Sequence, residues 1–282
     1  MVFFLLLCYL KIYPKEKFKM LKFRQLKKKV RRQFQFIFPY KYNPKRYSDT
    51  FLCKTPILDD SSVNEVPEVI YCFWTGTNEM SENRKRAVES LQKVSEVDVK
   101  LINPTNLHNY ILSEYPLHSA YEYLSLVHKA DYLRCYFMHH HGGGYSDVKI
   151  CVNSWKDSFH KLNKSDKQML GYSEIGHRAV AQLDGKLGKD LRRYFLTVIG
   201  NCAYICRPHT SFTMEWYAEL HERLDLHLPK LKLNPGNVWG DNEGYPIPWT
   251  GILGDIFHPL CLKYSKQIIV CEKIKPDFNN YR

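Results

Sequence analysis

The sequence of 282 residues has no long hydrophobic run. The apolar start of the chain is only about ten residues long, whereas a helix needs roughly 20 apolar residues to cross a bilayer. It also lacks the basic flank and the small-residue cleavage site of a signal peptide. Hydrophobic residues at 44% and charged residues at 25% exclude a disordered or fibrous protein. We therefore expect a globular protein that is not integral to a membrane.

Several motifs of nucleophilic, phosphate-binding and metal chemistry are also missing. The chain contains no Gly-x-Ser-x-Gly, no P-loop and no zinc-type ligand spacing. Its nine cysteines are odd in number and scattered, and none forms a CxxC pair. A secreted disulfide framework requires paired cysteines. We therefore expect reduced, mostly buried thiols in a cytosolic protein.

Most of the chain has no excess of either charge. Residues 51–282 hold 27 basic and 27 acidic side chains, so the net charge of +12 belongs entirely to residues 1–50, which hold 14 basic and 2 acidic ones. No basic patch continues beyond that segment, which disfavours nucleic-acid binding. We accordingly divide the chain into a basic membrane-association segment with its linker, residues 1–50, and one catalytic domain, residues 51–282.

The N-terminal segment has the pattern of a basic amphipathic helix. Apolar residues recur at steps of three and four, at Phe23, Leu26, Val30, Phe34 and Ile37, with Lys and Arg over most of the remaining surface. Such a helix is suited to the headgroup layer of an anionic membrane, where each basic residue contributes on the order of 1 kcal/mol. The alternative is a solvated helix that packs on its own domain. The first interpretation predicts a peripheral protein on the cytoplasmic face of a membrane.

Beyond a linker at residues 40–66, strand-like and helical patterns alternate. A continuous apolar run at 69–74 predicts a buried strand. Further strands are expected at 97–102, 144–150, 168–172, 195–206 and 267–271, and helices at 81–94, 104–112, 121–140 and 211–223. This alternation predicts an α/β fold with a Rossmann-type, mostly parallel sheet flanked by helices.

One stretch combines charged residues with glycines. Asp131 and Arg134 are three residues apart and so share one side of a helix. Glycines 142–144 remove every Cβ from the following turn, which would let the backbone approach a ligand. Asp147 follows where a strand leaves the sheet, the usual place for ligands in open α/β sheets. The alternative is a helix C-cap beside a surface ion pair.

These residues resemble a known family. Val69-Ile70-Tyr71-Cys72-Phe73-Trp74-Thr75-Gly76, then Ala130-Asp131-Tyr132-Leu133-Arg134, then Gly142-Gly143-Gly144-Tyr145-Ser146-Asp147 resemble the sugar-binding-region glycosyltransferases with a DXD motif. That family includes Och1-like mannosyltransferases and bacterial capsule and lipopolysaccharide transferases. The resemblance covers residues 66–155 and extends loosely to about 260, where residues 249–253 stand in place of a late donor loop.

The resemblance implies a GT-A-like fold, a nucleotide-sugar donor and retention of anomeric configuration. It also implies donor contacts, which fall on Phe73, Trp74, Gly76, Asp131, Arg134, Gly143, Gly144 and Tyr145. The expected function is transfer of a sugar to a hydroxyl of a growing surface glycan, with a glycan or lipid-linked glycan as the acceptor. A catalytically inactive, membrane-docked protein that binds a glycan or a nucleotide is the alternative.

The sequence departs from the family at one position, because the second acid of the DXD motif is Lys149. In the family that acid generally holds a divalent metal on the donor diphosphate. Three alternatives follow: Asp147 holds Mn²⁺ or Mg²⁺ with a late group such as Asp255 or His258, no metal is needed, or the enzyme is inactive. In the second case Lys149 itself supplies positive charge to the leaving group, so that Asp147 and Lys149 are the catalytic pair.

Two further clusters complete the candidates. His139, His140 and His141 are consecutive and cannot all face one metal from a helix, so we interpret them as a helix end. Trp239, Tyr245 and Trp249 lie among acidic and amide residues. They form either a stacking platform for an acceptor sugar or an ordinary aromatic loop.

Overall fold

The computed structural model of the protein describes residues 30, 33, 35, 37–54 and 65–279. The chain divides into two units, Met1–Lys41 and Tyr42–Arg282, each of which is considered by itself. In the first unit the described residues between 30 and 37 are helical. The rest of the predicted amphipathic helix, with most of its apolar stripe and its basic residues, lies outside the described residues. The predicted division of the chain at residue 50 stays a prediction.

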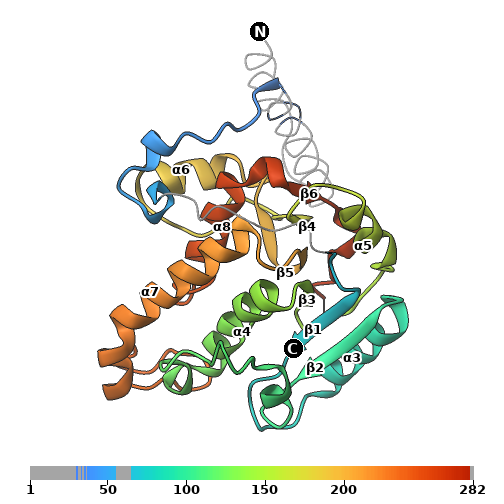
Figure 1. The fold of residues 1–282 in the computed structure, drawn as a ribbon, viewed down its shortest axis with the longest axis vertical. Coiled ribbons are helices and arrows are strands. Elements are labelled where there is room, and N and C mark those ends of the chain that lie inside the picture. Colours follow the sequence, from blue (N-terminus) through green and yellow to red (C-terminus); the bar gives the residue numbers. More distant parts are fainter. Residues whose placement is uncertain (1–29, 31–32, 34, 36, 55–64, 280–282) are drawn as a thin grey trace, which may run out of the picture. The chain divides into compact units, whose positions relative to one another are not determined.

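The second unit is built on a mostly parallel sheet (Figure 1). Its strands are β1 (Val69–Phe73), β2 (Asp98–Ile102), β3 (Gly143–Ser146), β4 (Met169–Ser173), β5 (Ile199–Cys206) and β6 (Ile268–Val270), in the order β2-β1-β3-β5-β4-β6. β1 pairs in parallel with β2 and β3, and β4 pairs in parallel with β6. β5 is antiparallel to both of its neighbours, β3 and β4. The predicted fold class, a mostly parallel sheet flanked by helices, is confirmed.

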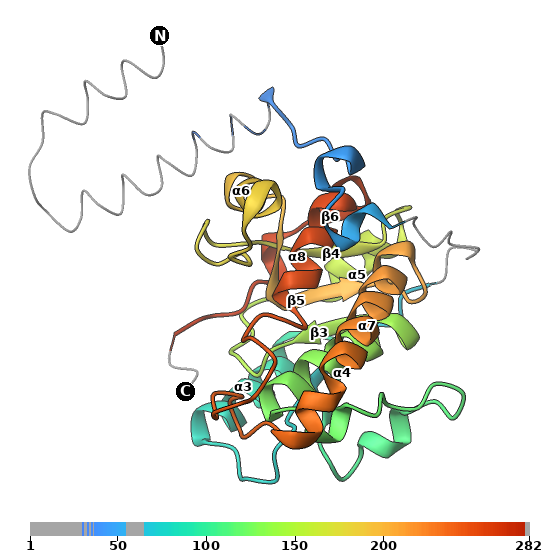
Figure 2. The same cartoon turned by 90° about the vertical axis from the view of Figure 1, so that its left-hand side faces the viewer.

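The helices of this unit cover both faces of the sheet (Figures 1 and 2). They are α3 (Glu82–Val94), α4 (Leu126–His140), α5 (Lys156–Asn163), α6 (Gly185–Arg193), α7 (Ser211–Leu233) and α8 (Gly254–Lys263). α4 and α7 lie side by side. None of the helices that the structure describes is long and apolar enough to cross a bilayer.

The apolar run of β1 packs on both faces because successive side chains of a strand point in opposite directions. Ile70 and Cys72 belong to a buried cluster with residues of α3 and α5. Tyr71 and Phe73 face the other way, and their rings lie 4.9 and 5.0 Å from the ring of Phe137 in α4. The continuous apolar run in this part of the sequence therefore correctly predicted a strand that is buried on both faces.

Most expected elements are present, with differences at their ends. The helix expected at 121–140 begins as a 3-10 turn, Tyr121–Tyr123, and its α-helical part starts after Ser125, whose side chain caps the His128 amide. The segment 104–112 forms only a 3-10 helix, Leu107–Tyr110. The helix expected to end at Arg223 continues to Leu233. The helices α5, α6 and α8 were not predicted.

The segment expected to be a linker is partly structured. Residues Pro44–Tyr47 and Phe51–Cys53 form 3-10 helices. Tyr47 is buried and donates a hydrogen bond of 2.8 Å to Asp190 of α6, which also forms an ion pair with Arg46. Residues 44–53 therefore belong to the packed structure of the second unit.

The glycines 142–144 do not form a ligand-facing turn. Gly142 ends α4 with φ +66°, and Gly143 and Gly144 begin β3, at the opposite end of the strand from Asp147. A Cβ on Gly142 would lie 2.5 Å from Pro208, and one on Gly143 would lie 2.9 Å from the carbonyl oxygen of Val69. The rationale for Gly143 and Gly144 as donor contacts is corrected accordingly, because these glycines are needed for close packing of the chain on itself.

The three consecutive histidines do end a helix, as expected: His139 and His140 close α4, and His141 follows as its cap. The rings of His139 and His140 lie 4.8 and 5.0 Å from the ring of Tyr217 in α7, and His221 lies 4.0 Å from the same ring. Burial, reinforced by neighbouring imidazoles, lowers the pKa of His139 to about 3 and those of His140 and His221 to about 4. The contact between α4 and α7 is therefore built from neutral imidazoles.

We expect this contact to make the protein acid-labile. Since the folded pKa values lie below the ordinary 6.5, the unfolded chain binds more protons than the native one below pH 6.5. The stabilisation is fully present above pH 6.5 and is lost as the pH falls towards 4, by on the order of several kcal/mol. Urea unfolding at pH 7.5 and pH 5 measures the effect.

The matched variants are His140→Phe and His108→Asn. Neither ring nitrogen of His140 has a hydrogen-bond partner among the described residues, so phenylalanine is expected to fit and to reduce the pH dependence. His108 is exposed and its replacement is expected to leave the profile unchanged. Equal stability of the wild-type protein at both pH values would contradict this account.

Candidate active site

The carboxyl ends of the parallel strands meet at one edge of the sheet. Trp74 follows β1, Asp147 follows β3 and Glu174 follows β4 at this edge. Because β5 runs in the opposite direction, its first residues, including Asn201 and Cys202, arrive at the same edge. Ligands of open α/β sheets bind at such an edge, where the strand order reverses. Here the order reverses between β1 and β3.

Asp147 is the centre of a charged cluster at this edge. Its Oδ1 accepts a hydrogen bond of 2.6 Å from the Tyr145 hydroxyl and lies 3.2 Å from the Arg134 guanidinium. Its Oδ2 accepts a short hydrogen bond from the Lys149 ammonium. The Asp147 amide donates to the Cys202 carbonyl at 2.8 Å, which fixes the backbone after β3. Both carboxylate oxygens therefore carry cationic partners.

The two charges of the pair stabilise each other strongly. The side chains of Asp147 and Lys149 are 18% and 8% exposed. Burial opposes ionisation of both, but the Lys149 and Arg134 charges hold the pKa of Asp147 well below its ordinary value. Asp147 and the Cys202 sulfur, 3.1 Å from the ammonium, likewise hold the pKa of Lys149 above its ordinary value. Both groups are charged at neutral pH.

The strand expected at 144–150 would have included both Asp147 and Lys149, and the structure places both beyond its end. β3 ends at Ser146, so the two residues lie in a turn. The Lys149 amide donates to the Asp147 carbonyl at 2.7 Å, which closes that turn. The predicted pairing of the side chains is present, on a different backbone conformation.

Arg134 connects helix α4 to the residue that follows β3 and to the start of β5. Its guanidinium lies 3.6 Å from Asp131 and donates a 3.3 Å hydrogen bond to the Asn201 carbonyl. It also lies 4.5 Å above the ring of Tyr145. Its Nε is buried without a hydrogen-bond partner among the described residues. Burial raises the pKa of Asp131, although Arg134 opposes that shift.

The remaining predicted donor contacts differ in accessibility. Phe73 and Tyr145 are buried and stack on each other at 5.5 Å, so they support Arg134 from behind. Trp74 is half-buried, and its indole donates a 2.8 Å hydrogen bond to the Asn78 carbonyl. Gly76 is needed locally, because a Cβ there would lie 2.4 Å from the Asn78 amide oxygen. Trp74 is the one of these four that the structure leaves partly open to a ligand.

A cavity of about 240 Å³ opens at the ends of β1 and β2, along the same edge of the sheet. Apolar side chains from β2, the following turn and α4 form much of its wall, and Thr75, Asn103, Tyr121 and Lys129 add polar groups. Burial lowers the pKa of Lys129. Leu133, directly before Arg134, also lines the cavity. Helix α4 therefore contributes both to the cavity and to the Asp147 cluster.

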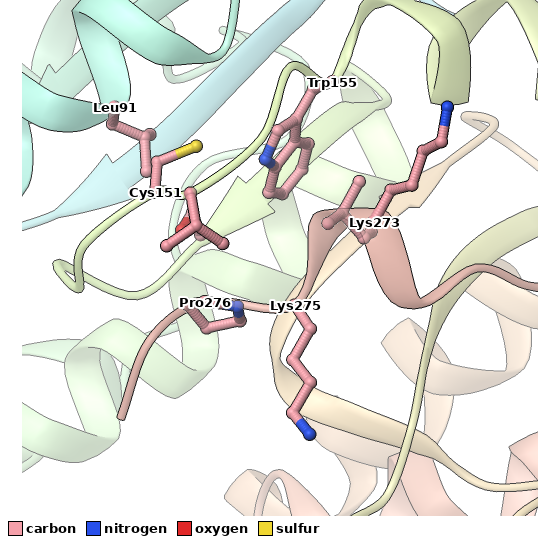
Figure 3. Close-up of a pocket in the computed structure, with 9 residues that line it drawn as sticks. Leu91, Cys151, Trp155, Lys273, Lys275 and Pro276 are labelled. Carbon is pink, nitrogen blue, oxygen red and sulfur yellow. The ribbon is translucent and has the colours of Figure 1, made fainter. Parts of the chain in front are cut away.

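A second crevice lies under the C-terminal segment (Figure 3). Leu91, Cys151 and Trp155 lie on one side of it and Pro276 on the other. The ammonium groups of Lys273 and Lys275 point away from it, in opposite directions. This crevice offers a ligand apolar packing surfaces and no convergent charge.

Asp147 and His258, two of the residues expected to hold a divalent metal, already have other partners. Both oxygens of Asp147 already have Lys149, Tyr145 and Arg134 as partners. His258 is buried, and its Nδ1 accepts a 2.8 Å hydrogen bond from the Ala181 amide. No group of three or more His, Cys, Asp or Glu side chains within the described ranges is arranged to bind a metal ion. Whether activity depends on a metal stays a prediction.

Asp255 and His258 lie in α8, and His258 is close to a residue that the sequence did not indicate, Glu174. Glu174 is buried, and its Oε1 lies 3.7 Å from Nε2 of His258. Burial raises the pKa of Glu174 to about 7, although backbone amides and the charges of Lys275 and Lys149 oppose that shift. An acidic residue close to the end of the strand expected at 168–172 was the signal that would have identified Glu174.

The eight cysteines that the structure describes are all free, and five of them are buried. The burial agrees with the expectation of mostly buried thiols, and their reduced state stays a prediction. Cys202 is the cysteine whose sulfur contacts the charged cluster, through Lys149.

Comparisons with known proteins place the chain in a family. Among solved structures, the PaToxG glycosyltransferase is similar to it, with 13% sequence identity, coverage of 70% of this chain and 69% of that chain, and a TM-score of 0.39. No curated protein sequence matches the chain. A family model described as capsular polysaccharide synthesis protein matches residues 9–181, which is more than half of the chain. The chain therefore belongs to the family of capsular polysaccharide synthesis proteins.

Proposed function

We propose that this protein is a glycosyltransferase that moves a sugar from a nucleotide-diphosphate donor to a hydroxyl of a growing capsular or lipopolysaccharide glycan, with retention of anomeric configuration. Family membership supports glycosyltransferase activity in capsule synthesis. The observation that carries the proposal is that the 240 Å³ cavity and the Asp147 cluster both lie at the carboxyl edge of the sheet and both include residues of α4.

The cavity suits one part of such a donor. Its volume is below the roughly 300–1,000 Å³ of pockets that enclose a whole drug-sized ligand, so it fits a nucleoside rather than a complete nucleotide sugar. Ile102, Leu107 and Leu133 provide apolar walls for a planar base, and Asn103 provides a hydrogen-bonding amide. Trp74, which follows β1, is an additional aromatic surface at the same edge.

The Asp147 cluster suits the diphosphate. Negative charge grows on the leaving nucleoside diphosphate as its bond to the sugar breaks, and preorganised cations stabilise that charge. Lys149 and Arg134 are such cations, because Asp147 fixes the position of both. In this proposal Lys149 supplies the point charge at the phosphate, Arg134 and Asp131 orient the donor, and Asp147 keeps the two cations in place.

A thermal-shift screen of nucleotide sugars, followed by detection of released nucleoside diphosphate and of labelled glycan, tests the proposal. Specific binding raises the melting temperature. We expect the shift and the turnover to persist in EDTA, and we expect Lys149→Ala to lower turnover by two to three orders of magnitude, as for a lost oxyanion donor. Activity abolished by EDTA and restored by Mn²⁺, together with a harmless Lys149→Ala, would refute the role given to Lys149.

The alternative function is a catalytically inactive protein that binds a nucleotide or a glycan. It is favoured by one observation, the complete pairing of Asp147 with protein cations where the related family has a metal ligand. Binding of a nucleotide sugar without release of nucleoside diphosphate, with any acceptor glycan or with water, would establish it in place of the transferase.

We also propose that residues 1–50 attach the enzyme to the cytoplasmic face of an anionic membrane, where lipid-linked acceptors are found. The support is the sequence pattern, a basic helix with an apolar stripe, which holds the whole excess charge. Flotation with anionic liposomes tests it: we expect full-length protein to float and a variant without residues 1–41 to remain in the dense fraction. Equal flotation of the two proteins would contradict the proposal.

A further inference from the structure

The segment between α7 and α8, residues 234–253, presents two large aromatic side chains to solvent. Trp239 is 58% exposed and Trp249 is 61% exposed, and the neighbouring Val238 is 49% exposed. Scattered exposed apolar residues are ordinary, but large apolar side chains gathered on one segment mark a binding surface. Tryptophan offers a wide, rigid contact area at little cost in conformational entropy.

The backbone that carries these two residues is held firmly. The amide oxygen of Asn237 accepts hydrogen bonds from the amides of Trp239 and Gly240, at 2.9 and 2.7 Å. The Tyr245 hydroxyl is 2.8 Å from Nδ1 of His128, a buried residue in the first turn of α4. The exposure of the indoles is therefore not the result of a loose loop, because their backbone is anchored on a rigid helix.

The segment adjoins the candidate active site at α4. Thr75, which lines the cavity, donates a 2.6 Å hydrogen bond to the Leu126 carbonyl. The Leu126 amide in turn donates to the Asn237 carbonyl at 3.3 Å, and Nε2 of His128 lies 3.4 Å from the Trp249 carbonyl. One helical turn thus joins the cavity wall to the backbone next to Trp239 and to that of Trp249.

The charge of the segment restricts what it binds. No Lys or Arg occurs between Lys232 and Lys263, whereas Asp241 and Glu243 are exposed close to the indoles. Anionic headgroups and nucleic-acid phosphates would be repelled by these carboxylates. Hydroxyl groups of a sugar, in contrast, donate hydrogen bonds to carboxylates, and the C–H face of a sugar ring packs on the face of an indole.

We propose that Trp239 and Trp249 form the binding surface for the carbohydrate acceptor, with Asp241 and Glu243 as hydrogen-bond acceptors for its hydroxyls. The inference rests on the proposed transferase function, which it deepens by assigning the acceptor subsite. It places the growing glycan on the α4 side of the cavity, next to the donor.

The test uses the full-length protein with Trp239→Ala, Trp249→Ala, the double variant and the control Leu226→Ala. Leu226 lies in α7 and is 73% exposed, so its replacement removes a comparable exposed apolar side chain outside the proposed surface. The probe is an array of immobilised bacterial capsular and lipopolysaccharide glycans. We expect about fivefold weaker binding for each single variant and more than tenfold for the double variant.

Donor binding provides the second arm. We expect nucleotide-sugar thermal shifts to be the same in all four variants as in the wild-type protein. If nucleotide sugars bind but no glycan does, or if the double variant binds glycans as tightly as wild type, the acceptor surface is overturned while the transferase function stands. If glycans bind through the indoles but no nucleotide sugar binds or turns over, the transferase function fails instead. Loss of anionic-liposome binding in the double variant, without loss of glycan binding, would assign the surface to the membrane and overturn the inference.

Discussion

Arg134→Ala is expected to lower the free energy of unfolding by about 3–5 kcal/mol, because it leaves the buried Asp131 carboxylate without its cation and Asp147 with Lys149 alone. Arg134 lies 3.2 Å from Asp147 and 3.6 Å from Asp131, and its side chain is 13% exposed. For a domain of this size the loss corresponds to a fall in melting temperature of roughly 10 °C. Differential scanning fluorimetry at pH 7.5 and chemical unfolding measure it.

Arg134→Lys is the matched control. Lysine retains the charge but cannot contact two carboxylates with a planar fork, so we expect an intermediate loss. Combining Arg134→Ala with Asp131→Asn removes one uncompensated carboxylate and is expected to recover part of the stability. A raised donor KM without any change in melting temperature would instead indicate that Arg134 acts on the donor alone and that its ion pairs contribute nothing to the fold.

Asp147→Asn is expected to lower turnover by two to three orders of magnitude, the usual effect of disordering one charge-stabilising group. The amide keeps the volume of the carboxylate but no longer fixes two cations by charge. It also leaves Lys149 buried without a counter-ion, at a cost of about 1–3 kcal/mol in stability. The structure therefore predicts a moderate loss of stability in addition to the loss of turnover. Release of nucleoside diphosphate and thermal unfolding are measured on the same sample.

The double variant Asp147→Asn, Lys149→Gln separates the two effects. It removes both members of the pair, so no buried charge is left without a partner and stability is expected to recover. Turnover is expected to stay low, because the point charge at the phosphate is gone. If the double variant regained activity, neither residue would be needed for transfer and the site assignment would be wrong.

The strands and the longer helices were predictable from the sequence because each has a clear local pattern. The run before Trp74 is apolar without interruption, and the helix before Gly142 has both a capping serine and a terminating glycine. The helices that were missed lack such signals. α6 contains two glycines and α8 contains Pro259, while α5 has only eight residues. Tertiary packing stabilises these three helices, and local helix propensity does not reveal that packing.

The sequence predicted only those residues of the candidate site that lie on consecutive elements of the chain. Asp131, Arg134 and Asp147 lie close together because a helix and the next strand of the chain carry them. Asn201 and Glu174 reach the same edge through β5 and β4, and that placement depends on a strand order that no single sequence displays. The glycines were misread for a related reason: the residues that crowd them, such as Pro208 and Val69, are distant in sequence.

The reversed strand β5 has a consequence for how the protein is made. It is the fourth strand of six in the sheet but the fifth in the sequence, and it joins β3 to β4. A nascent chain that has emerged only to residue 181 contains Asp147, Lys149 and four of the strands, yet β3 and β4 have nothing to pair with between them. Since unpaired edges promote association with other chains, the ribosome-bound intermediate is aggregation-prone until about residue 206 is exposed. The family model covers residues 9–181 and therefore ends before β5, which the sheet needs in order to form. Fragments or fusions made for expression should accordingly retain residues beyond β5.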